Sequence, residues 1–482
     1  MSSNADGVAR KLASEPTTSD ANRVGDQDNG EIDPLPVYAE RTAARQPHQK
    51  KLEVTLDKDG KPLVSFMIYG HEALSTNVGI ILEGSGPLRG VVRLDSDAPN
   101  SIRSIILTVR GDYLQVRGDY MVDPTYMATP NGPEVEKNHT FFNHSETLWS
   151  QDDGKPLNSS TDSKVDSLQS PFKGKLKGEY TWPISVTLPK EVQFTPIHES
   201  APRTFPLPHS FNERFIRATI GYTATIKFIR FGFLKEDYEL SQPFGYYRVT
   251  YPPPFPPLRD VAYQEGTPLL GPSIDPYGWH SQEPIHIKGR IFKSVDFTAQ
   301  CTLYISKPLA YQAGSFIPLY IRIESDNEQA LDLLANPKAI HVRVRRQIII
   351  NHSHKHNLSD NVMLNENLDY SQRAVWWTST EENRTSKSCF FSGELHLKPG
   401  MKPNTELGNF KLSYSVMLYD FSAVGLEFEE QNFLQEFPIE ICTFYALGPR
   451  PKSTTTHDCT PDVPLGQRIV PNAEPIVSTG FY

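Results

Sequence analysis

The sequence predicts an all-β protein made of two related β-sandwiches in tandem, and three observations support this fold class. Apolar and polar residues alternate with a period of two in several segments, which a helix cannot satisfy. Proline accounts for 40 of the 482 residues, and prolines this frequent argue against long helices because they interrupt helical hydrogen bonding. A proline-rich stretch at 251–290 separates two groups of alternating segments. It is therefore the expected connector between two domains.

The clearest alternation before the connector lies at 216–228, where Ile, Ala, Tyr and Phe occupy even positions and Arg, Thr, Gly and Lys occupy odd ones. One face is expected to enter a core and the other to meet water, as in an antiparallel sheet. Two shorter alternating segments, 52–56 and 64–68, flank an Asp-Gly pair typical of a hairpin turn. These patterns predict an N-terminal β-sandwich over 51–250.

The same alternation returns after the connector, at 317–323, 340–344 and 410–418. These segments predict a C-terminal β-sandwich over 291–447. Five prolines between positions 252 and 257 favour an extended, polyproline-like course for the connector.

Both ends of the chain have few aromatic residues. Residues 1–50 contain a single one, Tyr38, and such a composition buries too little apolar surface to offset the entropy of ordering. We therefore expect a disordered arm at 1–50 and a disordered tail at 448–482.

The composition excludes several function classes. A net charge of −9 gives no support for nucleic-acid binding, which usually requires a basic surface. Four cysteines without a close CxxC pair predict reduced thiols rather than a disulfide framework or a zinc site. The N-terminal segment lacks the apolar region of a signal peptide, and no run of about 18 apolar residues occurs. We expect a soluble, cytoplasmic protein without a cofactor.

Four stretches resemble the arrestin family. LEGSGPLRGVVRLDSDAPNSIRSIILTVRGDYL at 82–114 is similar to the early strands of an arrestin N-domain. The stretches at 178–192 and 207–232 resemble the later part of that domain, and 306–325 resembles the opening of the C-domain. The connector resembles that of fungal α-arrestin-like proteins.

The resemblance implies two tandem arrestin-type, immunoglobulin-like β-sandwiches and a non-enzymatic trafficking adaptor. Such adaptors bind membrane transporters or receptors as cargo and recruit a WW-domain ubiquitin ligase of the Nedd4 type. The cargo is then ubiquitinated, endocytosed and sorted. The implied location is the cytoplasm, with recruitment to the plasma membrane and endosomes. An alternative within the same class is a retromer-like sorting or signalling scaffold that recruits no ligase.

A candidate ligase-binding motif lies in the N-terminal arm, at Leu35, Pro36 and Tyr38. WW domains accept polyproline II ligands in an aromatic groove, because the stiff backbone loses little entropy on binding. Pro36 would fill the groove and Tyr38 would insert its ring. Leu35 stands where the commoner motif has proline, and a chance match of four residues is the alternative.

Two groups of basic residues are candidate contacts for cargo, for phosphate or for lipid: Lys173, Lys175 and Lys177, and Arg343 with Arg345. Period-two spacing places each group on one face of an extended segment. Arginine pairs with carboxylate and phosphate through two hydrogen bonds, and basic clusters attract anionic lipid. The alternative is the solvated outer face of a sandwich.

A third candidate comprises His352, His354 and His356, whose spacing could hold zinc or iron in a β-barrel enzyme. The polar residues that follow favour an exposed loop, so we predict no metal site. The glycine-rich stretch at 84–90 contains proline and precedes a strand rather than a helix, unlike a dinucleotide fingerprint. We therefore predict no catalytic residues.

Overall fold

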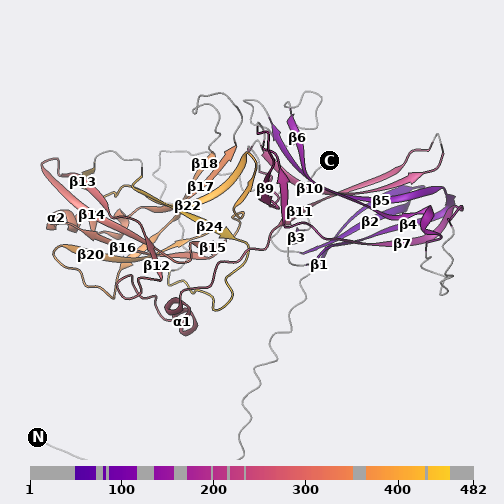
Figure 1. The fold of residues 1–482 in the computed structure, drawn as a ribbon. Helices are drawn as coiled ribbons and strands as arrows, with labels where there is room; N and C mark the ends of the chain where they lie inside the picture. The colour runs from indigo at the N-terminus through magenta and orange to yellow at the C-terminus, as the bar shows by residue number, and fades with distance from the viewer. Residues whose placement is uncertain are drawn as a thin grey trace, which may run out of the picture. The chain divides into compact units, whose positions relative to one another are not determined.

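The alternating segments of the sequence form β-strands (Figure 1). Within the described residues, only two strand pairs, β11–β3 and β15–β24, are parallel. The fold is therefore all-β and mainly antiparallel, as the sequence predicts. The computed structural model describes residues 49–71, 80–82, 86–116, 135–156, 171–196, 199–213, 216, 218–232, 235–350, 365–428 and 433–455.

Eleven described strands precede the connector. They are β1 (Gln49–Lys58), β2 (Lys61–His71), β3 (Ile80–Leu82), β4 (Leu88–Asn100), β5 (Ile102–Val116), β6 (Val135–Ser150), β7 (Leu176–Val186), β8 (Glu191–Phe194), β9 (Arg203–Pro206), β10 (Ala218–Arg230) and β11 (Tyr238–Tyr247). The main sheet has the order β6-β5-β10-β11-β3-β2-β4-β7, with β1 paired to β2. A short 3-10 turn, η3 (Gln151–Asp153), follows β6, and β8 pairs only with β9.

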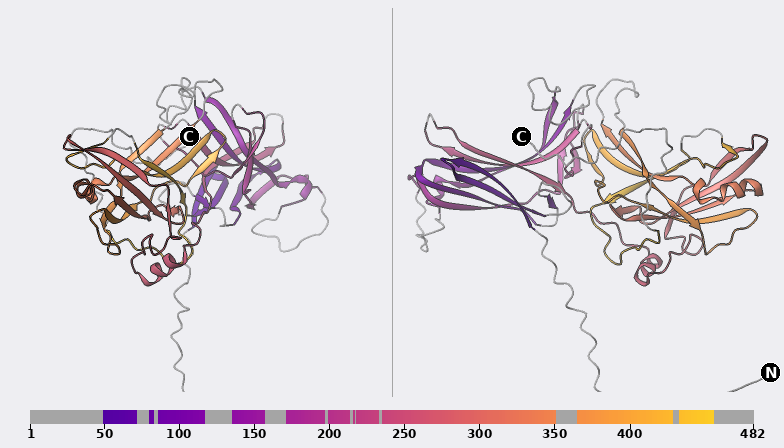
Figure 2. Two further views of the ribbon diagram at one scale, coloured as in Figure 1. Left: turned by 60° about the vertical axis from the view of Figure 1, so that its left-hand side comes forward. Right: turned by 180° about the vertical axis from the view of Figure 1, so that it is seen from behind.

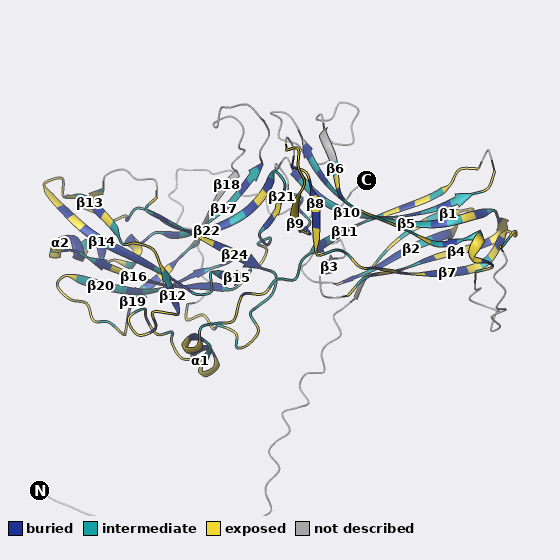
Figure 3. Ribbon diagram, viewed as in Figure 1, coloured by how far each residue is buried: buried dark blue, intermediate teal, exposed yellow. Residues whose placement is uncertain are grey.

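This long sheet folds over a shared aromatic core. Trp182 on β7 lies 6.3 Å from Trp149 on β6 and 6.4 Å from Phe228 on β10, measured between ring centroids. Strands at opposite ends of the sheet order therefore face each other. On β10, burial alternates residue by residue as the sequence predicts (Figure 3), because even positions enter this core.

Thirteen described strands form the second half of the chain, and the first of them begins within the connector at 251–290. They are β12 (Trp279–Ser281), β13 (Ile285–Ile291), β14 (Val295–Ser306), β15 (Ala310–Gln312), β16 (Phe316–Glu324), β17 (Val342–Ile350), β18 (Asn365–Arg373), β19 (Val375–Thr378), β20 (Ser388–His396), β21 (Thr405–Leu407), β22 (Phe410–Leu418), β23 (Leu426–Phe428) and β24 (Gln435–Cys442). They form a seven-stranded sheet around β14, β16 and β20 and a six-stranded sheet around β17, β22 and β24. A short helix, α2 (Glu328–Leu334), and the turn η4 (Pro337–Ala339) lie between β16 and β17.

These two sheets pack as layers of a β-sandwich-like half (Figure 2). The ring of His280 on β12 lies 5.9 Å from that of Phe437 on β24, across the two sheets. Neither sheet contains a strand from the first half. Among the described residues, no helix is both long and apolar enough to cross a membrane.

The connector differs from the expected extended course. It contains a helix, α1 (Pro257–Glu265), that begins at the last proline of the run. Pro257 is tolerated there because the first helical turn needs no backbone N–H donor. Gly266, with φ of 70°, ends the helix in the left-handed conformation that glycine adopts without strain. Strand pairing resumes at Trp279, earlier than the boundary expected near residue 291.

Two adjacent isoleucines on β5 test which face of this strand enters the core of the first half. Ile105 is fully buried opposite Phe228, whereas Ile106 on the other face is half-buried. We expect Ile105→Ala to lower the free energy of unfolding by about 2–5 kcal/mol, because it leaves a cavity in the core. Ile106→Ala is the matched control and should cost less than about 1.5 kcal/mol. Urea denaturation measures both values, and equal losses would contradict the assignment.

Candidate functional site

Two of the predicted sites lie outside the described residues. They are the motif at 35–38 and the histidine cluster at 352–356. Where the chain is described, no group of three His, Cys, Asp or Glu residues is arranged to hold a metal ion.

The predicted lysine group is exposed but does not form one strand face. Lys173 and Lys175 precede β7, and Lys177 lies near its start. All three side chains belong to exposed residues. They therefore present positive charge to solvent, from a loop and a strand end rather than from a sheet surface.

The predicted arginine pair lies on β17, where both residues are partly buried. Arg345 forms an ion pair with Glu436, and its side chain is only 12% exposed. The Ser415 hydroxyl donates a hydrogen bond to the same carboxylate at 2.6 Å. The charge of Arg345 is thus compensated inside the protein, which sequence alternation alone does not reveal.

The adjacent residue, Arg346, belongs to a cluster that sequence reasoning missed. Its Nη2 atom lies 2.7 Å from both carboxylate oxygens of Glu213, and Lys402 Nζ lies 3.2 Å from Oε1 of the same carboxylate. Glu213 follows β9, whereas Lys402 lies between β20 and β21. The cluster therefore connects chain segments from before and after the connector.

Aromatic groups pack against this partly buried cluster. The rings of Phe211 and Phe410 lie 4.7 Å apart, and Lys402 Nζ lies 4.5 Å above the Phe211 ring. Burial raises the pKa of Glu213, but the positive charges and hydrogen bonds of Lys402 and Arg346 lower it more, so its pKa lies below the usual range. The carboxylate is therefore ionised at neutral pH and holds two cations.

Neutral groups add further contacts between the same parts of the chain. The backbone N–H of His209 donates to Thr405 Oγ1 at 3.1 Å, and that of Thr250 donates to Thr443 Oγ1 at 2.7 Å. Burial, aided by the charge of Arg248, lowers the pKa of His209 to about 3. Its imidazole is consequently neutral, and Nδ1 accepts a hydrogen bond from the Arg248 backbone.

A cavity of about 710 Å³ lies within the second half of the chain. The connector, β16, β19, β20 and residues 452–455 form its walls. Its aromatic lining consists of Tyr263, Trp279, Phe316, Tyr320, Trp376 and Trp377.

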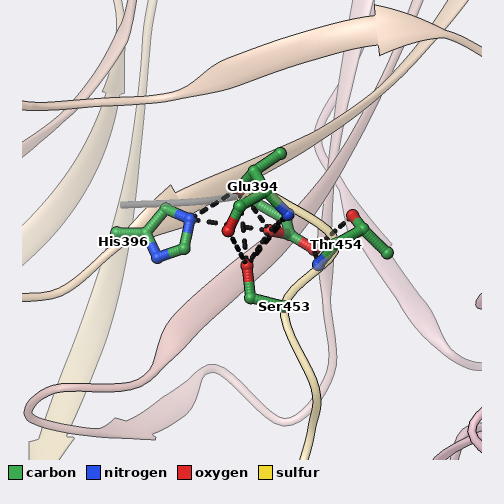
Figure 4. Close-up of polar contacts among 5 residues, drawn as sticks. Glu394, His396, Ser453 and Thr454 are labelled. Atoms are coloured by element: carbon green, nitrogen blue, oxygen red, sulfur yellow. Dashed lines mark hydrogen bonds and ion pairs between the residues drawn. The ribbon is translucent and has the colours of Figure 1, made fainter. Parts of the chain in front are cut away.

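Residues 452–455, the end of the 448–455 segment, form one part of the cavity wall, and a buried glutamate on β20 holds them in place (Figure 4). Glu394 is 4% exposed. Its Oε2 accepts hydrogen bonds from the hydroxyls of Ser453 at 2.6 Å and Thr455 at 2.7 Å. Its Oε1 accepts from the hydroxyl of Thr454 at 2.8 Å and from its backbone N–H at 3.0 Å. The first residues of the expected disordered tail are thus docked on a strand.

The charge of Glu394 is balanced mainly by hydrogen-bond donors. Burial raises its pKa, but bonds from Ser453, Thr454 and Thr455 together lower it below the usual range. His396 Nε2 lies 3.5 Å from Oε2 and 2.8 Å from the Thr455 hydroxyl. The hydrogen bonds of this arrangement hold the segment, and their loss would release it.

Comparison with protein-family models and with curated proteins finds no match for this chain. Its function is therefore inferred from the residues and geometry described above.

Glu213→Gln tests the charged cluster. Removing the negative charge leaves Arg346 and Lys402 uncompensated, so we expect the free energy of unfolding to fall by about 1–3 kcal/mol at pH 7. Because the folded-state pKa of Glu213 is lowered, its stabilisation is present above the unfolded-state pKa of about 4.3 and is lost as the pH falls through the folded-state pKa. The difference in the free energy of unfolding between the unaltered protein and Glu213→Gln should therefore shrink in acid.

Urea denaturation at several pH values measures this difference. Glu440→Gln is the control, because Glu440 is exposed on β24. If Glu213→Gln lost the same free energy of unfolding at pH 7 and at pH 3, the charge of Glu213 would not be the source of that loss.

Glu394→Ala tests how the 448–455 segment is held. Loss of the acceptor should release the segment, and trypsin should cleave after Lys452 at least about tenfold faster, because several hydrogen bonds to a charged group are lost. Circular dichroism checks that the sheets remain folded. Glu440→Ala, at an exposed position, should leave the cleavage rate unchanged, and a slow rate in Glu394→Ala would refute the assignment.

Proposed function

We propose that this chain is an α-arrestin-like adaptor with two tandem arrestin-type, immunoglobulin-like β-sandwich domains. It binds membrane transporters or receptors and recruits a WW-domain ubiquitin ligase of the Nedd4 type for cargo ubiquitination, endocytosis and sorting. The main support is the division of the described strands into two β-sandwich-like halves, 49–247 and 279–442, which share no sheet. A proline-containing connector and the cluster around Glu213 link these halves.

The ligase-recruiting part of the proposal rests on Leu35, Pro36 and Tyr38, which precede β1 in the sequence. A WW groove would accept Pro36 in polyproline II geometry and the Tyr38 ring beside it. A single motif binds weakly, and several WW domains in one ligase or clustering of the adaptor would raise the effective affinity.

For cargo, exposed positive charge is the supporting feature. Lys173, Lys175 and Lys177 are exposed, and they suit acidic or phosphorylated cytoplasmic tails at a membrane surface with anionic lipid. Arg345 contributes less in this proposal, since Glu436 already compensates its charge. The adaptor works by binding, in the cytoplasm and by recruitment to the plasma membrane and endosomes, and needs no cofactor.

Tyr38→Ala tests the ligase contact in the full-length protein. Loss of the inserted ring should weaken binding to the isolated WW domains of the ligase at least about tenfold, because buried aromatic anchors dominate such interfaces. Val37→Ala is the matched control, since it changes the variable position of the same motif. Isothermal titration calorimetry measures both affinities. Equal affinity of Tyr38→Ala and the unaltered protein would contradict the motif, and no binding by either would favour a sorting scaffold without ligase.

A further inference from the structure

The 448–455 segment combines a hydroxyl-dependent contact with basic residues at regular positions. Ser453 donates its hydroxyl to Glu394 at 2.6 Å. Arg450 and Lys452, at the third and first positions before Ser453, are exposed, and so is the serine residue itself. Basic residues at these positions are complementary to an acidic substrate groove in a modifying enzyme.

We propose that Ser453 is a phosphorylation site for a protein kinase that selects basic residues before its acceptor, and that phosphorylation releases the 448–455 segment from Glu394. The inference goes beyond the adaptor function and does not depend on it.

The modification is a phosphoryl transfer from a nucleoside triphosphate, which the kinase binds. A bond forms between Ser453 Oγ and the γ-phosphorus, and the bond from that phosphorus to the β–γ bridging oxygen breaks. The nucleoside diphosphate leaves, and the hydroxyl proton passes to a base of the kinase. The kinase acts on the segment when it is transiently undocked, and the phosphate then prevents docking again.

Phosphorylation reverses the electrostatics at Glu394. The serine oxygen loses the proton that it donates to the carboxylate and gains a group with a charge of about −1.5 to −2 at pH 7. Glu394 is buried, so repulsion between the two anions is poorly screened there. The two nearby basic side chains do little to offset this repulsion, because His396 Nε2 is already hydrogen-bonded to the Thr455 hydroxyl and Lys452 is exposed to solvent. The docked arrangement therefore disfavours the phosphate strongly.

Release of the segment would also open the aromatic cavity. Lys452, Ser453, Thr454 and Thr455 form part of its wall, and Trp376 also lines it. Three of the five tryptophans of the chain line this cavity. Tryptophan fluorescence therefore reports directly on the change.

The first experiment identifies the acceptor. The full-length protein is incubated with ATP and a kinase that requires arginine three residues before its acceptor serine, and phosphopeptides are mapped by mass spectrometry. We expect phosphate on Ser453 and none on this segment in Ser453→Ala. Phosphate on Thr454 or Thr455 instead, or no phosphate on the segment, would overturn the assignment.

The second experiment measures release. Phosphoserine is incorporated genetically at position 453, and hydrogen–deuterium exchange is followed at the amides of Thr454 and Thr455. We expect exchange at least tenfold faster than in the unmodified protein, together with stronger acrylamide quenching of tryptophan fluorescence. Phosphoserine at Ser422, an exposed residue after β22, is the matched control and should change neither readout.

Unchanged exchange with phosphate at position 453 would overturn the proposal. So would an equal rise in exchange across β22 and β24, because it would indicate unfolding of the sheets rather than release of one segment.

Discussion

The constraint on which this structure depends is the compensation of two carboxylates that are shielded from water, Glu394 almost completely and Glu213 in part. A buried charge is costly unless hydrogen bonds or opposite charges replace its hydration. Glu213 meets this need with Arg346 and Lys402 from the second half of the chain. Glu394 meets it with hydroxyl and amide groups of the 448–455 segment. In both cases the need for compensation brings together parts of the chain that are distant in sequence.

The contacts of Glu213 and of Glu394 differ in the kind of chemical change that can break them. Guanidinium and ammonium groups stay charged across the physiological pH range, so the Glu213 cluster is stable to ordinary changes in conditions. Serine and threonine hydroxyls are neutral donors that can be converted into anions. The contact at Glu394 is thus the one that a covalent modification can reverse. One carboxylate joins the two halves durably, and the other can act as a release point.

Sequence patterns predicted those features that depend on local periodicity. The strand at 218–230 follows directly from its period-two alternation, since burial of one face requires it. Helix α1 was missed because the prolines that suggested an extended chain also suit the first turn of a helix. The contact between Glu394 and Ser453 joins residues 59 positions apart, and no local pattern encodes it. Arg345 and Arg346 are adjacent in sequence, yet different carboxylates from distant segments hold them.

Different interactions stabilise the sandwich cores and the 448–455 segment. Each core strand buries several large apolar side chains, and burial of one such side chain contributes about 1.5–3 kcal/mol. The segment is held by a few hydrogen bonds, each contributing about 1.5–3 kcal/mol when the acceptor is charged and less when the bond is neutral. Its opening breaks these hydrogen bonds but leaves the apolar cores buried, so it is a local event distinct from the unfolding of a sheet. Because residues 452–455 form part of the cavity wall, access to the aromatic lining can change while the sheets that carry it remain intact.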